Sequence, residues 1–147
     1  MSYYKLTFLF TDLKVEKKNY LINEYVEMWL DDGCLFGRYL PDVVVDYKSA
    51  IKVMEDREKV CEYRPYPMVF DCKNVKYWTN EAREFQNTKR NYKLMIAAAV
   101  IYTDSLVTNT LINFFMKFNK PLVPARFFTN FEEALQWIEQ YKVRYIE

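Results

Sequence analysis

The feature that most constrains the fold is a run at residues 94–102, LMIAAAVIY, that is almost entirely apolar. A strand with such a run has no polar face to offer to water, so both faces of its sheet must be covered. Central strands of parallel sheets have this character, because helices lie on both sides of them. The alanines at 97–99 would also let a covering helix approach closely. The sequence therefore predicts an α/β protein with a parallel sheet at its centre.

Strand and helix patterns alternate around this run. Asp31-Asp32-Gly33 lies between two β-rich stretches and predicts a tight hairpin, because both central residues of the favoured turn have positive φ. The overall order implies right-handed crossovers and a mostly parallel mixed sheet, with an N-terminal antiparallel hairpin and about four helices. The predicted strands are residues 3–10, 20–30, 34–40, 67–72, 94–102 and 124–128, and the predicted helices are 46–60, 79–91, 105–118 and 129–141.

Each predicted helix begins at a residue type that caps helices well. The predicted caps are Asp46 or Ser49, then Thr79, then Asp104 or Ser105, and finally a capping box formed by Thr129 and Glu132. In the first helix the apolar residues Ala50, Met54 and Cys61 are expected near one face. The charged segment 55–59, EDREK, is expected on the opposite face.

The length of 147 residues fits one domain. The alternating stretch 3–10 predicts a short strand, and the polar stretch that follows separates this strand from the rest. We therefore expect residues 1–19 to form an N-terminal strand and tether, and residues 20–147 to form a single α/β domain. A tethered strand of this kind covers an edge of its own sheet or reaches a second subunit.

The charge balance gives no reason to expect a nucleic-acid partner. Lys and Arg total 21 against 20 Asp and Glu, so the net charge of +1 produces no general attraction to nucleic acid or to anionic membranes. The densest basic cluster is interleaved with two glutamates, which is typical of a solvated helix face. That cluster contains Arg83, Lys89, Arg90 and Lys93, and the glutamates are Glu81 and Glu84.

The residue inventory argues against an enzyme. The chain has no His, which excludes Ser-His-Asp and Cys-His catalysis and the common His-containing zinc sites. With only 2 Gly it cannot build a P-loop or a glycine-rich dinucleotide turn. The paired carboxylates at 31–32 are explained by the predicted hairpin turn, in which Asp is favoured. Those at 132–133 are explained by their place in the first turn of the last helix, where negative charge complements the helix dipole. We expect no catalytic site, no cofactor and no metal.

The cysteines indicate a reducing compartment. Cys34, Cys61 and Cys72 are odd in number and have no C-x-x-C spacing, which favours buried reduced thiols over disulfides or a zinc site. The apolar part of the N-terminal stretch is too short for a signal peptide, and no stretch approaches the roughly 18 apolar residues of a membrane span. These features predict a cytoplasmic protein without a transmembrane segment.

The predicted helix 105–118 is apolar around most of its circumference. Phe114, Phe115 and Phe118 belong to its main stripe, together with Val107 and Leu111. The simpler interpretation is a core helix packed on the sheet. A helix apolar over so much of its surface is also expected to bury a second face against a partner subunit, an apolar ligand or a membrane surface.

Two segments carry a family resemblance. YPMVFDCKNVKYWTNEAREF at 66–85 and NFFMKFNKPLVPARFFTNFEEALQWI at 113–138 resemble the uncharacterised bacterial STAS-like proteins. That group is similar in fold to the anti-sigma-factor antagonists and is linked by name to the CRAL-TRIO lipid-transfer fold. The resemblance covers roughly residues 20–141 and implies a sheet backed by helices, in agreement with the element order above.

The resemblance also implies a position for a regulatory switch. Anti-sigma-factor antagonists bind a kinase-like partner and are switched by phosphorylation of a Ser at the start of the helix after the VFD-type strand. The pattern places Thr79 just before that position and Glu81 on it. A carboxylate cannot be phosphorylated, so the switch is absent or displaced to Thr79. The simpler interpretation is that Thr79 caps the helix and Glu81 complements its dipole.

Two hypotheses for function follow. The first is a non-enzymatic STAS-like protein-interaction or regulatory module that self-associates as a homodimer or docks on a protein partner. The alternative is a binding or carrier protein for a small apolar or lipid-like ligand held against the sheet. This alternative predicts an apolar pocket with a few polar groups at its mouth. Its candidate contacts are Trp78, Phe114, Phe115 and Phe118.

Overall fold

The computed structural model describes residues 18–103, 112–113 and 120–146. The predicted strand at 3–10 and nearly all of the predicted helix 105–118 lie outside these residues, although 112–113 are helical. The described strands are β1 (Lys18–Ile22), β2 (Val26–Asp31), β3 (Cys34–Tyr39), β4 (Val43–Val45), β5 (Tyr66–Asp71), β6 (Val75–Trp78), β7 (Met95–Ile101) and β8 (Ala125–Phe128). The described helices are α2 (Tyr47–Val60), α3 (Asn80–Gln86), α4 (Lys89–Tyr92), α6 (Phe131–Ile138) and the 3-10 helix η2 (Glu139–Tyr141).

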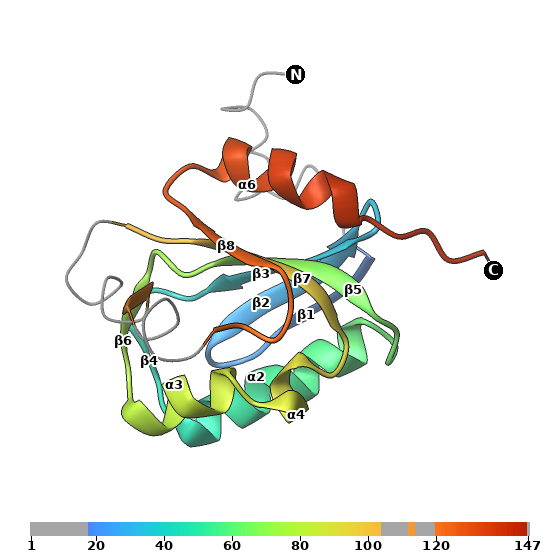
Figure 1. Cartoon of the computed structure of the whole chain (residues 1–147). Helices are drawn as coiled ribbons and strands as arrows, with labels where there is room; N and C mark the ends of the chain where they lie inside the picture. Colours follow the sequence, from blue (N-terminus) through green and yellow to red (C-terminus); the bar gives the residue numbers. More distant parts are fainter. Residues whose placement is uncertain (1–17, 104–111, 114–119, 147) are drawn as a thin grey trace.

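A six-stranded sheet with the order β1-β2-β3-β5-β7-β8 forms the centre of the protein. The pairs β1–β2 and β2–β3 are antiparallel, and the pairs β3–β5, β5–β7 and β7–β8 are parallel. Figure 1 shows α6 on one side of this sheet and α2, α3 and α4 on the other. The prediction of an α/β fold with a mostly parallel mixed sheet is confirmed.

The apolar run at 94–102 forms β7, which lies inside the sheet between β5 and β8. Ala97 and Ala99 are fully buried and belong to the same apolar cluster as Ala134 of α6. The small side chains on the strand and on the helix let the helix lie close to the sheet, as expected from the alanines. On the opposite face of β7, Ala98 and Val100 point toward α2, α3 and α4.

The tight hairpin is confirmed at its central residues. β2 and β3 are joined by Asp32 and Gly33, whose φ angles are 47° and 75°. A Cβ at Gly33 would clash with the backbone oxygen of Val143, so this position requires glycine both for its positive φ and for its lack of a side chain. The Lys142 ammonium lies 2.8 Å from Asp32, so the turn is also held by the segment that follows α6.

The predicted single strand at 20–30 is wrong, because the chain turns between Ile22 and Val26. The side-chain oxygen of Asn23 accepts hydrogen bonds from the backbone N–H groups of Tyr25 at 2.8 Å and Val26 at 2.9 Å. This local bonding offers the backbone an alternative to a continuous strand. The N-terminal third is therefore a three-stranded antiparallel meander, of which the predicted hairpin is the second half.

A small second sheet lies beside the main one and was not predicted. β4 and β6 pair in parallel, with Val44 opposite Tyr77 and Val45 opposite Trp78. Both strands are short, so neither has the length from which alternation can be read in a sequence. The pairing matters because it fixes the position of Trp78 at the end of β6, where Trp78 belongs to the same apolar cluster as residues of α2, α3 and the main sheet.

Helix α2 begins as predicted, with both candidate caps in use. Ser49 N–H donates to the Asp46 carboxylate at 2.8 Å, and the Asp46 backbone N–H donates to the Ser49 hydroxyl at 2.8 Å. This reciprocal pair is a capping box. The helix ends at Val60, also as predicted.

Two other helix predictions need correction. The helix expected from Thr79 to Asn91 is divided into α3 and α4, because the Thr88 hydroxyl accepts from Asn91 N–H at 3.2 Å and starts a second helix. The cap of α6 is Asn130 and not Thr129, since the Asn130 side chain accepts from Glu133 N–H at 3.1 Å. Adjacent Thr and Asn compete for the same role, and Asn is the stronger N-cap.

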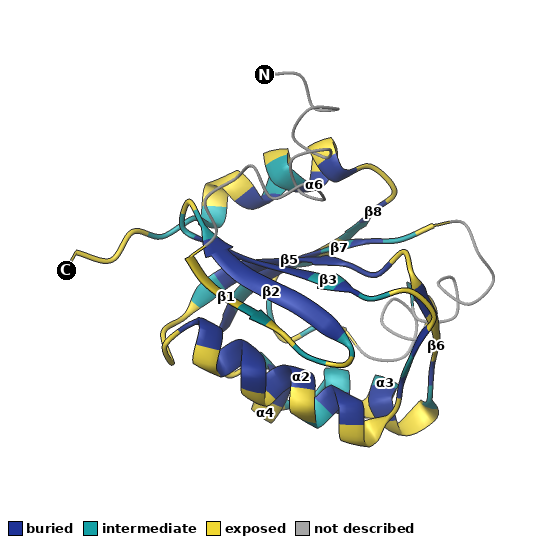
Figure 2. Ribbon diagram, turned by 180° about the vertical axis from the view of Figure 1, so that it is seen from behind, coloured by how far each residue is buried: buried dark blue, intermediate teal, exposed yellow. Residues whose placement is uncertain are grey.

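The interior agrees with the cysteine prediction. Cys34, Cys61 and Cys72 are buried free thiols. In Figure 2 the dark-blue buried residues concentrate on β2 and on the inner side of α2, whereas β1 is largely exposed. None of the described helices combines the length and the apolar character required to cross a membrane.

Candidate functional site

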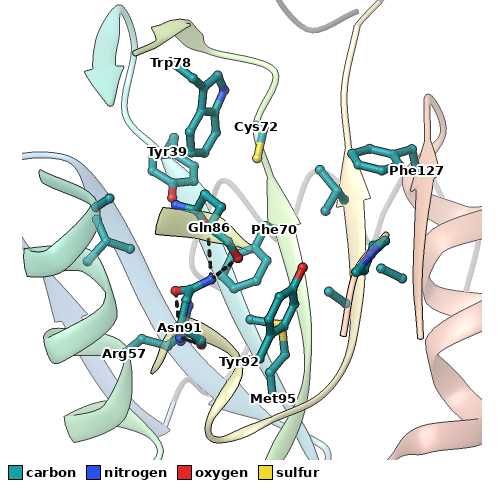
Figure 3. A pocket seen from close by; sticks show the side chains of 16 residues that line it. Tyr39, Arg57, Phe70, Cys72, Trp78, Gln86, Asn91, Tyr92, Met95 and Phe127 are labelled. Atoms are coloured by element: carbon teal, nitrogen blue, oxygen red, sulfur yellow. Dashed lines mark hydrogen bonds between the residues drawn. The ribbon is translucent and has the colours of Figure 1, made fainter. Parts of the chain in front are cut away.

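A cavity of about 70 Å³ lies between the main sheet and the layer formed by α2, α3 and α4. Figure 3 shows side chains from all of these elements converging on it. Its described lining residues are mostly apolar, with a few polar groups among them. They are Tyr39, Ala50, Val53, Arg57, Phe70, Cys72, Trp78, Gln86, Asn91, Tyr92, Met95, Ala98, Val100, Pro121, Ala125 and Phe127.

The strand register explains why space is left at this point. Phe70, Val100 and Phe127 are neighbours in register across β5, β7 and β8 and form one row of side chains on this face. In the next row Ala98 pairs with Ala125. Their short side chains leave space above the sheet next to the row of larger side chains. The hollow therefore follows from two alanines placed side by side in the sheet.

Arg57 enters this wall from α2, which corrects the prediction that 55–59 forms an exposed charged face. Asp56, Arg57 and Glu58 are only 2%, 3% and 5% exposed. The position follows from helix geometry, because Arg57 is three residues after Met54 and four after Val53, both of which are buried. The apolar spacing of α2 thus includes Arg57, and this spacing is the signal in the sequence that locates it.

The Arg57 guanidinium is incompletely bonded. Its Nη2 donates to the backbone oxygen of Asn91 at 2.6 Å and to the Asn91 side-chain oxygen at 3.3 Å. The guanidinium carbon lies 5.9 Å from the centre of the Phe70 ring. Nε is the only buried side-chain nitrogen or oxygen in the described part of the chain that has no hydrogen-bond partner. Burial lowers the pKa of Arg57 from its ordinary value.

Asn91 holds the polar end of the cavity in place. It is 2% exposed, and its side-chain amide donates to the backbone oxygen of Gln86 at 2.9 Å and to the Gln86 side chain at 3.2 Å. These bonds, drawn as dashed lines in Figure 3, join the end of α3 to α4. Asn91 is thus fixed before it accepts from Arg57, so the guanidinium is held in one orientation.

The other polar groups of the wall are neutral at physiological pH. Burial raises the pKa of Tyr92 to about 12 and raises that of Tyr39 further above its ordinary value. Burial likewise raises the pKa of the Cys72 thiol, so it is not a reactive thiolate. Among the described lining residues Arg57 is the only charged one and none carries a carboxylate. The arrangement is suited to holding a molecule and offers no evident pair of groups for acid–base transfer.

The residues predicted from the sequence are divided by the structure. Trp78 lies in the cavity wall, is 6% exposed and contacts Tyr39 edge-to-face with ring centres 5.4 Å apart. Phe114, Phe115 and Phe118 lie outside the described residues. Trp78 is therefore the predicted apolar contact that lies in the described wall, and the wall also contains Arg57, which was predicted to lie on the charged face of its helix.

The two predicted switch residues are not in the described wall of the cavity. Thr79 caps α3, with its hydroxyl accepting from Ala82 N–H at 3.2 Å, and Glu81 is exposed in the first turn. This is the simpler of the two interpretations made from the sequence. Phosphorylation of Thr79 stays a prediction.

A second hollow, of about 800 Å³, lies at the surface beside the Asp32–Gly33 turn. Both charge signs are present in its wall, and they partly neutralise each other. Arg144 lies 3.6 Å from Asp32, and the Asn19 amide donates to Glu62 at 2.8 Å. A hollow whose polar groups are already paired with one another offers less to a specific small ligand than the apolar cavity does.

Comparison with known proteins places the fold. No curated protein matches the chain. Among solved structures, the chain is similar to an uncharacterised protein of the DUF3478 family from Shewanella loihica PV-4, which has a SpoIIAA-like fold. The TM-score is 0.53 and the identity 13%, over 80% of this chain and 98% of that one. This likeness confirms the STAS-like fold. A family model matches residues 28–142, and the chain belongs to the family described as a domain of unknown function, DUF7793.

Proposed function

We propose that this protein is a non-enzymatic binding protein for a small, mainly apolar molecule, and that the cavity beneath α2, α3 and α4 is its binding site. The observation that carries the proposal is the space over the short side chains of Ala98 and Ala125, which is lined by larger apolar side chains. Binding sites for small molecules are typically concave, largely apolar and provided with a few fixed polar groups. Asn91, Arg57 and the two tyrosines supply such groups here.

The volume limits the size of what is bound. At about 70 Å³ the cavity is roughly half the size of the ~150 Å³ apolar cavity that accommodates benzene. It is also well below the roughly 300–1,000 Å³ of sites for drug-sized ligands. We therefore expect a short aliphatic chain of a few carbons, or the short end of a larger molecule.

The chemistry of the wall supports binding over catalysis. Proton transfer requires a group whose pKa lies near the working pH. Tyr39, Tyr92 and Cys72 all have their pKa raised by burial, and a guanidinium does not release its proton in this range. These groups position a ligand through neutral hydrogen bonds and one positive charge.

Filling the cavity tests the proposal. Ala98→Leu adds three carbons at the low point of the wall, so it should abolish binding of xenon and of butanamide while leaving the fold intact. Binding would be followed by chemical shift changes of methyl groups at Ala98, Val100 and Ala125 in labelled protein. Val44→Leu, on β4 and outside the described wall, is the matched control and should bind like the parent.

Two outcomes would overturn the proposal. One is that neither xenon nor butanamide shifts the methyl groups of the wall in the parent protein. The other is that Ala98→Leu, shown by circular dichroism to be folded, binds both probes as the parent does. Native mass spectrometry of protein purified under mild conditions provides an independent measurement, because a molecule retained from the host would appear as a constant added mass.

A second candidate function is the self-associating interaction module, and an exposed sheet edge favours it. β1 is an edge strand in the described sheet, with Tyr20 and Ile22 43% and 56% exposed. The backbone groups of an edge strand are able to pair with the same strand of a second copy. Light scattering should then give a dimer mass for the parent and a monomer mass for Ile22→Lys. A parent that is monomeric at every concentration would contradict this candidate.

A further inference from the structure

The bonding of Arg57 indicates what kind of small molecule the cavity takes. We infer that the ligand carries a single carboxylate group, which pairs with the Arg57 guanidinium while its short apolar chain fills the space over Ala98 and Ala125. This inference rests on the proposed function and adds a chemical class to it.

The first support is the unsatisfied donor. More than nine-tenths of buried polar groups in native proteins have a hydrogen-bond partner, so an exception calls for an explanation. Nε of Arg57 is such an exception, on a side chain that is 3% exposed and lines the cavity. A buried charge without a counter-charge is unfavourable, and an anion bound beside it removes that cost.

The second support is that the nearest acidic residues of α2 are already engaged elsewhere. Asp56 accepts from the Asn23 amide at 2.9 Å and lies 3.2 Å from the Lys52 ammonium. Glu58 pairs with Arg90 at 2.6 Å. No carboxylate in the described part of the chain lies within ion-pair distance of Arg57, so an external anion would be its counter-charge.

The charge of the wall favours a carboxylate over a phosphate. Arg57 is the only charged residue among the described lining residues, so the site offers one positive charge. A carboxylate brings one negative charge, whereas a phosphate monoester brings about −1.5 to −2. The planar guanidinium also matches the planar carboxylate, and the neutral hydroxyl group of Tyr39 adds a donor without adding charge. The Tyr92 hydroxyl already donates to the Asn87 side chain at 3.1 Å.

The positions of the groups define an orientation for the ligand. In Figure 3 Arg57 and Asn91 lie at one side of the cavity and Phe127 lies at the other. The carboxylate would therefore lie toward α2 and α4, and the chain would extend across β7 toward β8. Because only the apolar chain fills the cavity of about 70 Å³, butanoate, with a chain of three carbons beyond its carboxylate, is an appropriate probe. Butanamide is its neutral counterpart with the same number of heavy atoms.

The test compares these two probes by isothermal titration calorimetry, with acetate and hexanoate to span the chain length. The parent should bind butanoate at least about tenfold more tightly than butanamide, as expected for hydrogen bonds to a charged group. Arg57→Met should lose this preference and bind the two probes equally. Arg64→Met, a change to an exposed guanidinium outside the described wall, should keep the preference.

The possible outcomes separate the two proposals. Equal binding of butanoate and butanamide by the parent, or an unchanged preference in folded Arg57→Met, would overturn the carboxylate inference and leave the apolar binding site standing. Failure of every probe to bind the parent would overturn the binding function itself. If Arg57→Met does not fold, the preference of the parent for butanoate and the same preference in Arg64→Met still decide the question.

Discussion

Replacing Trp78 by leucine tests whether the wall of the cavity is part of the stable core. Trp78 is 6% exposed and stands beside Tyr77, which is 46% exposed on the same strand. The pair therefore offers a matched comparison, in which Trp78→Leu changes the wall and Tyr77→Leu changes the surface. The two substitutions differ by one position in sequence and lie on opposite sides of β6.

The expected cost follows from area and from one ring contact. A buried tryptophan covers about 150–250 Å² and leucine covers less, so the substitution loses roughly 70–100 Å² of buried apolar surface, or about 2 kcal/mol. Loss of the edge-to-face contact with Tyr39, with ring centres 5.4 Å apart, adds about 1 kcal/mol. We expect Trp78→Leu to lower the free energy of unfolding by about 3 kcal/mol, and Tyr77→Leu to lower it by less than about 1 kcal/mol.

Urea denaturation followed by far-ultraviolet circular dichroism measures both values. The substitution should also enlarge the cavity, so the preferred carboxylate should shift from butanoate toward hexanoate in calorimetry. A Trp78→Leu protein as stable as Tyr77→Leu, with an unchanged chain-length preference, would show that Trp78 does not pack in the wall as described.

Three further predictions concern the fold. Asp46→Ala should cost about 1 kcal/mol at neutral pH, because it removes the cap of α2. The backbone and side-chain hydrogen bonds from Ser49 lower the pKa of Asp46 in the folded protein. The stabilisation by this cap is therefore present above the unfolded-state pKa of Asp46 and is lost as the pH falls through the folded-state pKa. Urea titrations of the parent and of Asp46→Ala at several pH values measure this loss. Gly33→Ala should cost about 2 kcal/mol, since its φ is 75° and the added Cβ would meet Val143; a melting temperature equal to that of the parent would contradict the turn geometry. The thiols should react slowly with an aromatic disulfide reagent in the native protein and rapidly in urea, because burial raises their pKa, to about 12 for Cys61; fast labelling of the native protein would show that they are accessible.

Some parts of the fold were predictable because the determining interactions are local. The capping box of α2 involves residues only three positions apart, and the Asp32–Gly33 turn depends on the φ angles of two neighbours. The run at 94–102 could be placed inside the sheet because a strand without a polar face has no other stable position. For each of these, the sequence contains the whole physical cause.

Other parts depend on contacts that a single sequence does not display. The pairing of β4 with β6 joins residues about thirty positions apart, and neither strand is long enough to show a period. The turn at Asn23 was missed because its side chain competes with strand formation within a run that otherwise reads as β. The break between α3 and α4 has the same kind of cause at Thr88.

The candidate site was only partly predictable. Trp78 was identified as an apolar contact, but Arg57 was assigned to a solvated face because it lies within a charged segment. Its three- and four-residue spacing from Met54 and Val53 was available in the sequence and indicates the buried face. The space over Ala98 and Ala125 could not be foreseen, because it depends on the register between β7 and β8.

The central claim is that the Arg57 guanidinium receives an anion in an apolar cavity, and nuclear magnetic resonance of its Nε–H tests this most directly. The buried Nε–H should give a protected ¹⁵N-correlated signal, assigned by its absence in Arg57→Met. The account predicts that butanoate moves this signal downfield together with the methyl signals of Ala98 and Ala125, whereas butanamide moves only the methyl signals. An Arg57 signal that stays in place while butanoate shifts the methyl groups would contradict the claim.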